Sequence, residues 1–196
     1  RVGYSHIDTL DFRKIVIKGA DISRRDTFKL EEYDRLVRYM RTYVSKRECP
    51  DETERLERML VRDAILVASN TMLRVGELWN LKWKDILRIE QIFDEDEKAM
   101  SLVTINVRAE IAKTRKQRRV PVRGGEYIER IKARAIYTDP EDFIFCGVGK
   151  RTKQRVHFWY DHWAVLMGAI DIDYKERNLT WYSLRQDRKS TRLNAS

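Results

Sequence analysis

With 196 residues, the chain is long enough for one domain with a sizeable core. It carries 40 Lys and Arg against 31 Asp and Glu, a formal net charge of +9, and has no apolar run near the ~20 residues that a membrane-spanning helix needs. The excess charge favours a polyanionic partner, because a basic side chain near a phosphate releases counterions. A solvated basic surface without a partner would give the same balance, so composition leaves both possibilities open.

The cysteines and histidines give no sign of a disulfide framework or a metal site. Cys49 and Cys146 lie far apart in the sequence and form no Cys-x-x-Cys pair, so we expect two reduced thiols in a cytosolic protein. The first eleven residues contain no apolar stretch of the kind found in secretion signals. The three histidines have no metal-ligand spacing: His6, His157, His162.

The first third of the chain is predicted to be helical. A helix is expected over residues 29–45, with the Thr27 hydroxyl capping its first turn. Its apolar side chains recur at helical spacing: Leu30, Tyr33, Leu36, Val37, Met40, Val44. Residues 50–52, Pro-Asp-Glu, open a second helix with acidic side chains at its positive end. A short third helix is predicted over residues 75–81.

A small sheet should follow these helices. Residues 101–107 alternate and are rich in β-branched side chains, which predicts a strand. Residues 119–122 are the expected hairpin partner, and Pro121 places that strand at an edge of the sheet. Residues 142–145 are predicted to form the third strand. The five acidic residues within 90–97 are expected to lie in a solvated loop.

A helix over residues 156–169 and another that begins near Trp181 complete the pattern. The order of elements is helices, an antiparallel sheet, then helices again. It predicts an α+β domain, mainly α-helical, in which helices flank a small three-stranded antiparallel sheet.

Three segments carry residues suited to phosphate chemistry. In the first, Glu77 follows Arg74 by three residues, so both side chains lie on one face of a helix. An Arg fixed by a carboxylate can hold a phosphate oxygen, although most such pairs are ordinary surface ion pairs. In the second, six basic residues and no acid fall between Lys113 and Arg123, on a predicted hairpin that could enter a DNA groove or be a solvated tip. In the third, Arg185 ends the run Tyr-Ser-Leu-Arg at 182–185. Seen by itself, this run is equally typical of the start of a helix with an exposed arginine.

Taken in order, these segments resemble the catalytic domain of the tyrosine recombinases, the phage-type integrases. Residues 73–78 and 81–86 resemble the first arginine box of that family. Lys113-Thr114, followed by Arg-Val-Pro-Val at 119–122, is similar to the hairpin of the catalytic lysine. Residues 182–185 are similar to the second arginine box, where the family usually has His in place of Tyr182. The resemblance covers residues 24–185 and implies the fold of the DNA breaking-rejoining enzymes.

The resemblance implies a role for each residue. Arg74 and Arg185 would grip the non-bridging oxygens of a scissile phosphate, and Glu77 would orient the pocket. Lys113 would donate a proton to the departing 5′ oxygen, and Tyr182 would occupy the place of the first histidine. No metal or other cofactor is needed, because the arginines supply the positive charge. The other basic residues of the hairpin are expected to contact DNA: Arg115, Lys116, Arg118, Arg119.

The chain also departs from the family. Met72 stands where the family often has Gly, and no tyrosine follows Arg185 to serve as the nucleophile. We therefore expect residues 1–23 to be a linker or the remnant of an N-terminal DNA-binding domain, 24–186 an incomplete catalytic domain, and 187–196 a non-native tail. Such a fragment should bind a phosphate without cutting it.

Double-stranded DNA is the expected partner, with no membrane association. The parent protein is expected to act as a tetramer on DNA in the cytoplasm, encoded by a bacterium or phage. Three alternatives stay open: a non-catalytic DNA-binding protein of the same fold, an enzyme like the type IB topoisomerases, and an RNA-binding basic domain, which no stacked aromatic sheet motif supports.

Overall fold

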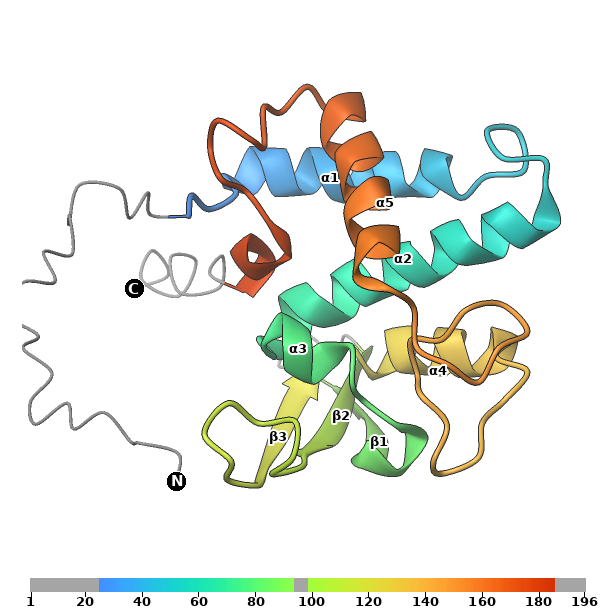
Figure 1. Ribbon diagram of the computed structural model, residues 1–196, viewed down its shortest axis with the longest axis vertical. Coiled ribbons are helices and arrows are strands. Elements are labelled where there is room, and N and C mark those ends of the chain that lie inside the picture. The colour runs from blue at the N-terminus through green and yellow to red at the C-terminus, as the bar shows by residue number, and fades with distance from the viewer. Residues whose placement is uncertain (1–24, 94–98, 186–196) are drawn as a thin grey trace, which may run out of the picture.

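The computed structural model describes residues 25–93 and 99–185, and Figure 1 shows how their elements are arranged. The linker and tail predicted at 1–23 and 187–196 lie outside these residues. The elements follow in chain order: α1 (Leu30–Tyr43), α2 (Glu52–Thr71), α3 (Val75–Leu78), the 3-10 turn η3 (Trp83–Asp85), β1 (Ile86–Phe93), β2 (Ala99–Val107), β3 (Arg118–Arg123), α4 (Gly125–Arg134), α5 (Val156–Ala169) and the 3-10 turn η4 (Trp181–Arg185).

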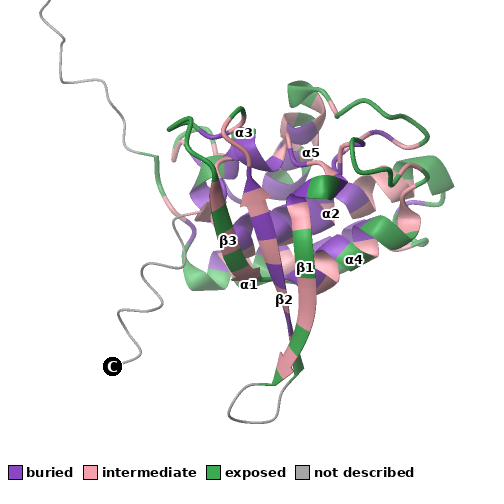
Figure 2. Ribbon diagram, turned by 90° about the horizontal axis from the view of Figure 1, so that it is seen from below, coloured by how far each residue is buried: buried purple, intermediate pink, exposed green. Residues whose placement is uncertain are grey.

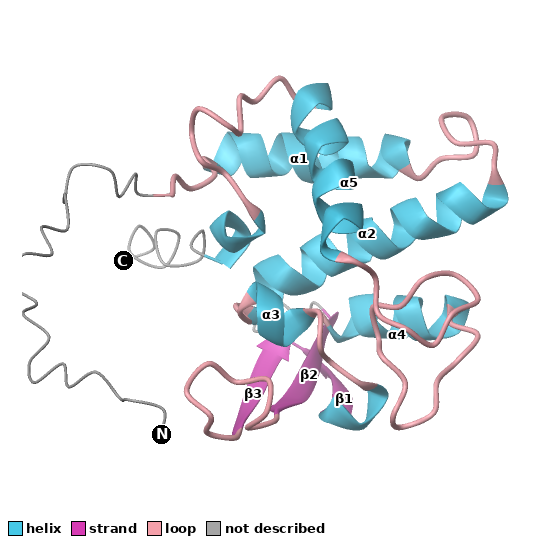
Figure 3. Ribbon diagram, in the orientation of Figure 1, coloured by secondary structure: helices cyan, strands magenta, loops and turns pink. Residues whose placement is uncertain are grey.

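The predicted α+β class is confirmed. In Figure 3, α1, α2 and α5 form a helical layer at the top, and the sheet lies below them with α4 at its side. No helix within 25–93 or 99–185 is long and apolar enough to span a membrane.

The starts of the first two helices show how local sequence fixes them. At α1 the Lys29 backbone N–H donates to Glu32 Oε2 at 2.8 Å, so Glu32 satisfies this end and the predicted Thr27 cap was wrong. At α2 the Glu54 backbone N–H donates to Asp51 Oδ1 at 2.7 Å, as the acidic start predicted.

The sheet has the order β1-β2-β3, and both pairs are antiparallel. The hairpin of β2 and β3 and the edge position of Pro121 are confirmed, and the side chains of Val103, Ile105 and Val107 alternate into the core. The third strand was predicted in the wrong place. Residues 142–145 form only a bridge from Phe143 to Lys82, and the third strand is β1.

The physical reason for that error lies in burial. Ile144 and Phe145 are buried, but as a loop whose Ile144 N–H donates to Leu81 O at 3.0 Å. A short apolar run looks the same in sequence whether a strand or a packed loop buries it. The strand β1 extends to Phe93, so it takes in half of the predicted acidic loop, and residues 94–98 lie outside the described residues.

The predictions for the other helices had different outcomes. The bounds of α5 match the prediction, and α3 is shorter than predicted. Where a helix was predicted to begin near Trp181, the described residues form the 3-10 turn η4. The helix α4 was missed, although Ile128 and Ile131 are spaced to share its buried face.

A cluster of tryptophans joins elements that are far apart in sequence. Trp159 and Trp163 of α5 and Trp181 of η4 are almost fully buried. Figure 2 shows buried residues in purple, and they lie in the interior of the domain. Trp79, which ends α3, stacks on Trp159 with ring centroids 5.6 Å apart and meets Trp181 edge-on at 5.8 Å. Such packing fixes the end of α3 against η4.

A buried ion pair joins the sheet to the segment after α3. Asp85 is fully buried and accepts from the Lys82 backbone N–H at 2.9 Å and from Arg108 Nε at 2.8 Å. Arg108 Nη2 also donates to Asn80 O at 3.0 Å. Arg108 directly follows β2, so this contact fixes the point where the chain leaves the sheet.

Replacing Asp85 with Ala should therefore lower the free energy of unfolding by about 3–5 kcal/mol, because Arg108 would stay in a largely buried position without its counter-ion. Urea denaturation measures this change. The control is Glu141→Ala, which removes an exposed carboxylate paired with Lys82 and Lys84 and should cost much less. Equal losses in the two variants would contradict a structural role for the buried pair.

Candidate functional site

The turn after α2 sets the position of Arg74. Met72 ends the helix with φ 55° and ψ 19°, in the left-handed region that favours glycine. This explains why glycine is common there in the resembled family. Leu73 is then buried, and Arg74 takes an extended conformation (φ −66°, ψ 146°) directly before α3.

Glu77 is the centre of the site. It is only 1% exposed, and its carboxylate accepts four hydrogen bonds from two arginines. Arg74 donates through its backbone N–H to Oε2 at 3.0 Å and through Nη1 to Oε1 at 3.1 Å. Arg118 donates through Nη1 to Oε1 at 3.1 Å and through Nη2 to Oε2 at 2.6 Å. One carboxylate thus holds the start of α3 and the start of β3 together.

The charges of this triad do not cancel. Burial raises the pKa of Glu77, but the hydrogen bonds from Arg118 and Arg74 lower it by more, so the pKa lies below its ordinary value of 4.5. The carboxylate is then ionised near neutral pH, and two guanidinium groups share one negative charge. The side chains of Arg74 and Arg118 are 30% and 35% exposed, so the remaining positive charge can be reached from solvent.

Arg118 was predicted to contact DNA together with its neighbours in the hairpin. It lies in β3, where its side chain is 35% exposed and is held by Glu77, and its contact with DNA stays a prediction. The other basic residues of the predicted hairpin are exposed, as expected: Lys113, Arg115, Lys116, Arg119.

The loop between β2 and β3 carries Lys113 and is anchored at both ends. Arg108 fixes its start through Asp85, and Gln117 Nε2 donates to Asn106 Oδ1 at 2.8 Å near its end. Ala112 is 4% exposed, so the residue directly before Lys113 is packed against the domain. Among the described residues the Lys113 ammonium group has no ion pair, and it faces solvent.

The turn η4 carries Tyr182 and Arg185 on the side of the molecule where α3 and the β2–β3 loop lie. The Thr180 backbone N–H donates to Ser183 Oγ at 3.1 Å, which fixes the start of the turn, and the turn contacts α2. Figure 1 shows η4, α3 and the β2–β3 loop all on the left of the domain. The structure therefore gathers the three predicted segments on one side, with Arg185 half-buried and Tyr182 37% exposed.

Sequence reasoning missed two residues that support this side. The role of Arg108 could not be predicted from local sequence, because its partner Asp85 lies 23 residues away. The Arg25 guanidinium lies over the Tyr182 ring at 4.7 Å from the centroid, a cation–π contact from the segment that precedes α1.

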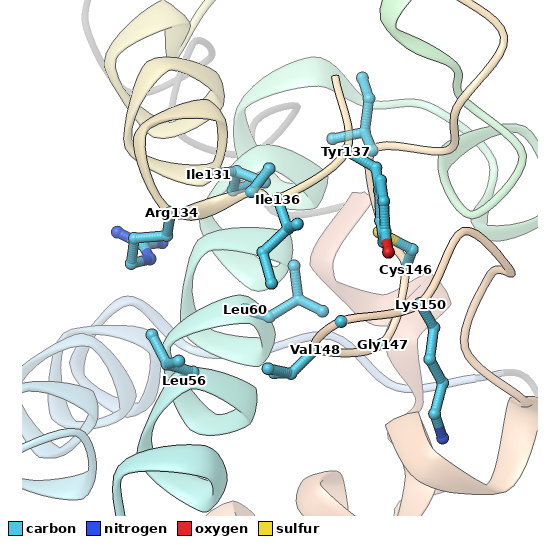
Figure 4. Close-up of a pocket in the computed structure, with 13 residues that line it drawn as sticks. Leu56, Leu60, Ile131, Arg134, Ile136, Tyr137, Cys146, Gly147, Val148 and Lys150 are labelled. Atoms are coloured by element: carbon cyan, nitrogen blue, oxygen red, sulfur yellow. The ribbon is translucent and has the colours of Figure 1, made fainter. Parts of the chain in front are cut away.

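An apolar cavity of about 140 Å³ lies elsewhere. Figure 4 shows it between α2, α4 and the loop that carries Cys146, with Leu60, Ile131 and Ile136 among its lining side chains. None of the predicted site residues lines it, so it is separate from the site.

Residues 27–185 match the phage integrase family. The chain belongs to this family. The match covers most of the chain and includes both arginine segments and the Lys113 loop. No curated protein matches the sequence.

The family's fold is also seen in a solved structure. The integrase-family chain is similar to the XerH site-specific recombinase bound to a palindromic difH substrate, in a post-cleavage complex, with a TM-score of 0.56 and 19% identity. The similarity covers 82% of this chain and 40% of the XerH chain, so this chain spans less than half of that protein. At this identity the likeness establishes the fold.

The domain should lose stability at acid pH when the Glu77 carboxylate is protonated. The pKa of Glu77 is lowered in the folded state, so its contribution to stability is fully present above about pH 4.5 and is lost as the pH falls through the folded-state value. The free energy of unfolding of the wild type should therefore fall more steeply below pH 4.5 than that of Glu77→Gln. Denaturant titrations between about pH 3 and pH 7, a range that includes the ordinary carboxyl pKa values, measure the free energy of unfolding of both proteins. Parallel curves would show that folding does not lower the pKa of Glu77.

Proposed function

We propose that the chain is the phosphate-holding part of a site-specific recombinase that acts on double-stranded DNA. In this proposal Arg74 and Arg185 bind the non-bridging oxygens of the scissile phosphate. The observation that carries the proposal is the buried carboxylate of Glu77, which fixes Arg74 and leaves positive charge on the triad.

The geometry suits electrostatic stabilisation of a transition state. Charge accumulates on the equatorial oxygens as the phosphate becomes pentacoordinate, and a guanidinium fork matches two such oxygens. Arg74 is already held by Glu77 before substrate binds, so little reorganisation is needed during the reaction. This preorganisation gives the arginine a larger effect than a mobile surface side chain would have.

Lys113 supplies the proton in the proposed reaction. As the bond between phosphorus and the 5′ oxygen breaks, the ammonium group would protonate the departing oxygen and so prevent an unstable alkoxide. The anchored ends of the β2–β3 loop limit where Lys113 can move. Tyr182 can hydrogen-bond the phosphate from η4, with Arg25 over its ring.

The attacking group is not proposed among these residues, because Tyr182 is assigned to the phosphate in this proposal. We infer a catalytic unit over 24–186, with 1–23 as a linker and 187–196 as a non-native tail. Tetramer assembly of the parent on DNA and a cytoplasmic location belong to the same proposal. A second candidate is a non-catalytic DNA-binding protein of this fold, which the exposed basic side chains of the β2–β3 loop would serve equally well.

DNA binding should be weak and steeply dependent on salt, because phosphate contacts dominate the affinity. Replacing Lys113, Arg115 and Lys116 together with Ala should weaken binding and flatten the plot of log affinity against log salt by up to about 0.9 for each lost contact. Fluorescence anisotropy of a labelled duplex at several salt concentrations measures both effects.

The control replaces Lys46 and Arg47 with Ala. These two exposed basic residues lie in the turn between α1 and α2, at the opposite end of the domain in Figure 1, and the control removes two positive charges where the test variant removes three. These changes should leave the slope nearly as it is. An affinity that does not respond to salt, or equal effects of the two sets of substitutions, would argue against DNA binding by this face.

A further inference from the structure

We infer that Arg118 is a positioning residue, which acts through Glu77 to keep Arg74 free to bind a DNA phosphate. The inference rests on the proposed function and adds a third arginine to it. In this role Arg118 does not touch the phosphate itself.

The two arginines use the carboxylate differently. Arg118 makes an end-on fork, with Nη1 on Oε1 and Nη2 on Oε2. The Arg74 side chain makes a single hydrogen bond, from Nη1 to Oε1, and its second contact comes from the backbone. Within the described residues the Nε and Nη2 groups of Arg74 therefore have no partner, and the side chain is 30% exposed. These donors are the ones that a phosphate could use.

Removing the Arg118 fork would change what Glu77 does to Arg74. A buried carboxylate is costly without full pairing, and a guanidinium fork is the strongest partner available to it. With Arg118 absent, Arg74 is the one cation still bonded to Glu77 in the described structure, so the carboxylate would draw it into a bidentate pair. That pair would have no net charge and fewer free donors. Arg118 thus maintains the positive charge of the site.

The same contact also affects the loop of Lys113. Arg118 is the first residue of β3 and follows the β2–β3 loop directly, so its bond to Glu77 ties the end of this loop to α3. Arg119 provides the contrast. Side chains alternate along a strand, and Arg119 is exposed on the other face with no bond to Glu77.

The test follows the arginine side chains by NMR. The full chain, labelled with ¹⁵N, is titrated with a short duplex at low salt, and the Nε–H signals of Arg74 and Arg118 are assigned with the Arg74→Lys and Arg118→Lys variants. We expect the Arg74 signal to shift on binding and the Arg118 signal to stay in place. In Arg118→Ala the shift of Arg74 should be lost, and in Arg119→Ala it should persist.

Several outcomes would overturn the inference. If the Arg118 signal shifts as much as that of Arg74, Arg118 is a direct DNA contact. If the Arg74 response survives in Arg118→Ala, Arg118 has no influence on it. The backbone spectrum reports whether Arg118→Ala is folded. If it is not, Arg118→Lys replaces it, since a lysine keeps the charge without the fork, and a full Arg74 response there would overturn the role of the fork.

A failure of the proposed function would look different. In that case the Arg74 signal of the wild type would not respond to the duplex at all. The phosphate site itself would then be disproved, and the role of Arg118 with it.

Discussion

The site depends on the pairing of the buried Glu77 carboxylate with two arginines. A buried negative charge must be paired, and Glu77 is paired by two arginines that come from different parts of the fold. Arg74 reaches it from the turn after α2, and Arg118 reaches it from the start of β3. The need to pair one charge therefore sets where the helical layer meets the sheet. It also decides how much positive charge that junction presents to solvent.

Other contacts extend this constraint to the remaining parts of the site. The pair of Asp85 and Arg108 fixes the start of the Lys113 loop, and the rings of Trp79, Trp159 and Trp181 fix η4 beside α3. Asp85 is buried and Arg108 largely so, and salt screens such a pair much less than an exposed one. The residues proposed to bind DNA are instead exposed or half-exposed. The domain thus combines a rigid interior with a basic face, which suits a site that must be in position before a phosphate arrives.

The sequence predicted the parts that depend on short-range patterns. Local patterns in the sequence predicted α1, α2 and α5, and alternation predicted β2, with β3 as its hairpin partner. It failed where long-range packing decides the structure. The apolar run that contains Ile144 and Phe145 is buried as a loop, with an isolated bridge from Phe143 to Lys82 in place of a strand pairing.

The candidate site shows the same division. The spacing of Arg74 and Glu77 predicted their contact, but its geometry differs from the one expected. Arg74 is extended directly before α3, and Glu77 reaches back to it from the third position of that helix. The contact between Glu77 and Arg118 joins residues 41 positions apart, and nothing local indicates it. Charge density correctly suggested a basic hairpin, but it could not separate Arg118, which is half-exposed and bonded to Glu77, from Arg119, which is exposed.

The most direct test of the site uses a nicked suicide duplex with the 196-residue chain. On a native gel we expect a retarded complex that is weakened when Arg74 and Arg185 are both replaced with Ala. On a denaturing gel we expect no covalent protein–DNA band, because none of the residues proposed to hold the phosphate is proposed to attack it. A covalent band from this chain would contradict the proposal and identify Tyr182 or another tyrosine as the attacking group. A native complex that the double variant leaves unchanged would show that the arginines do not hold the phosphate.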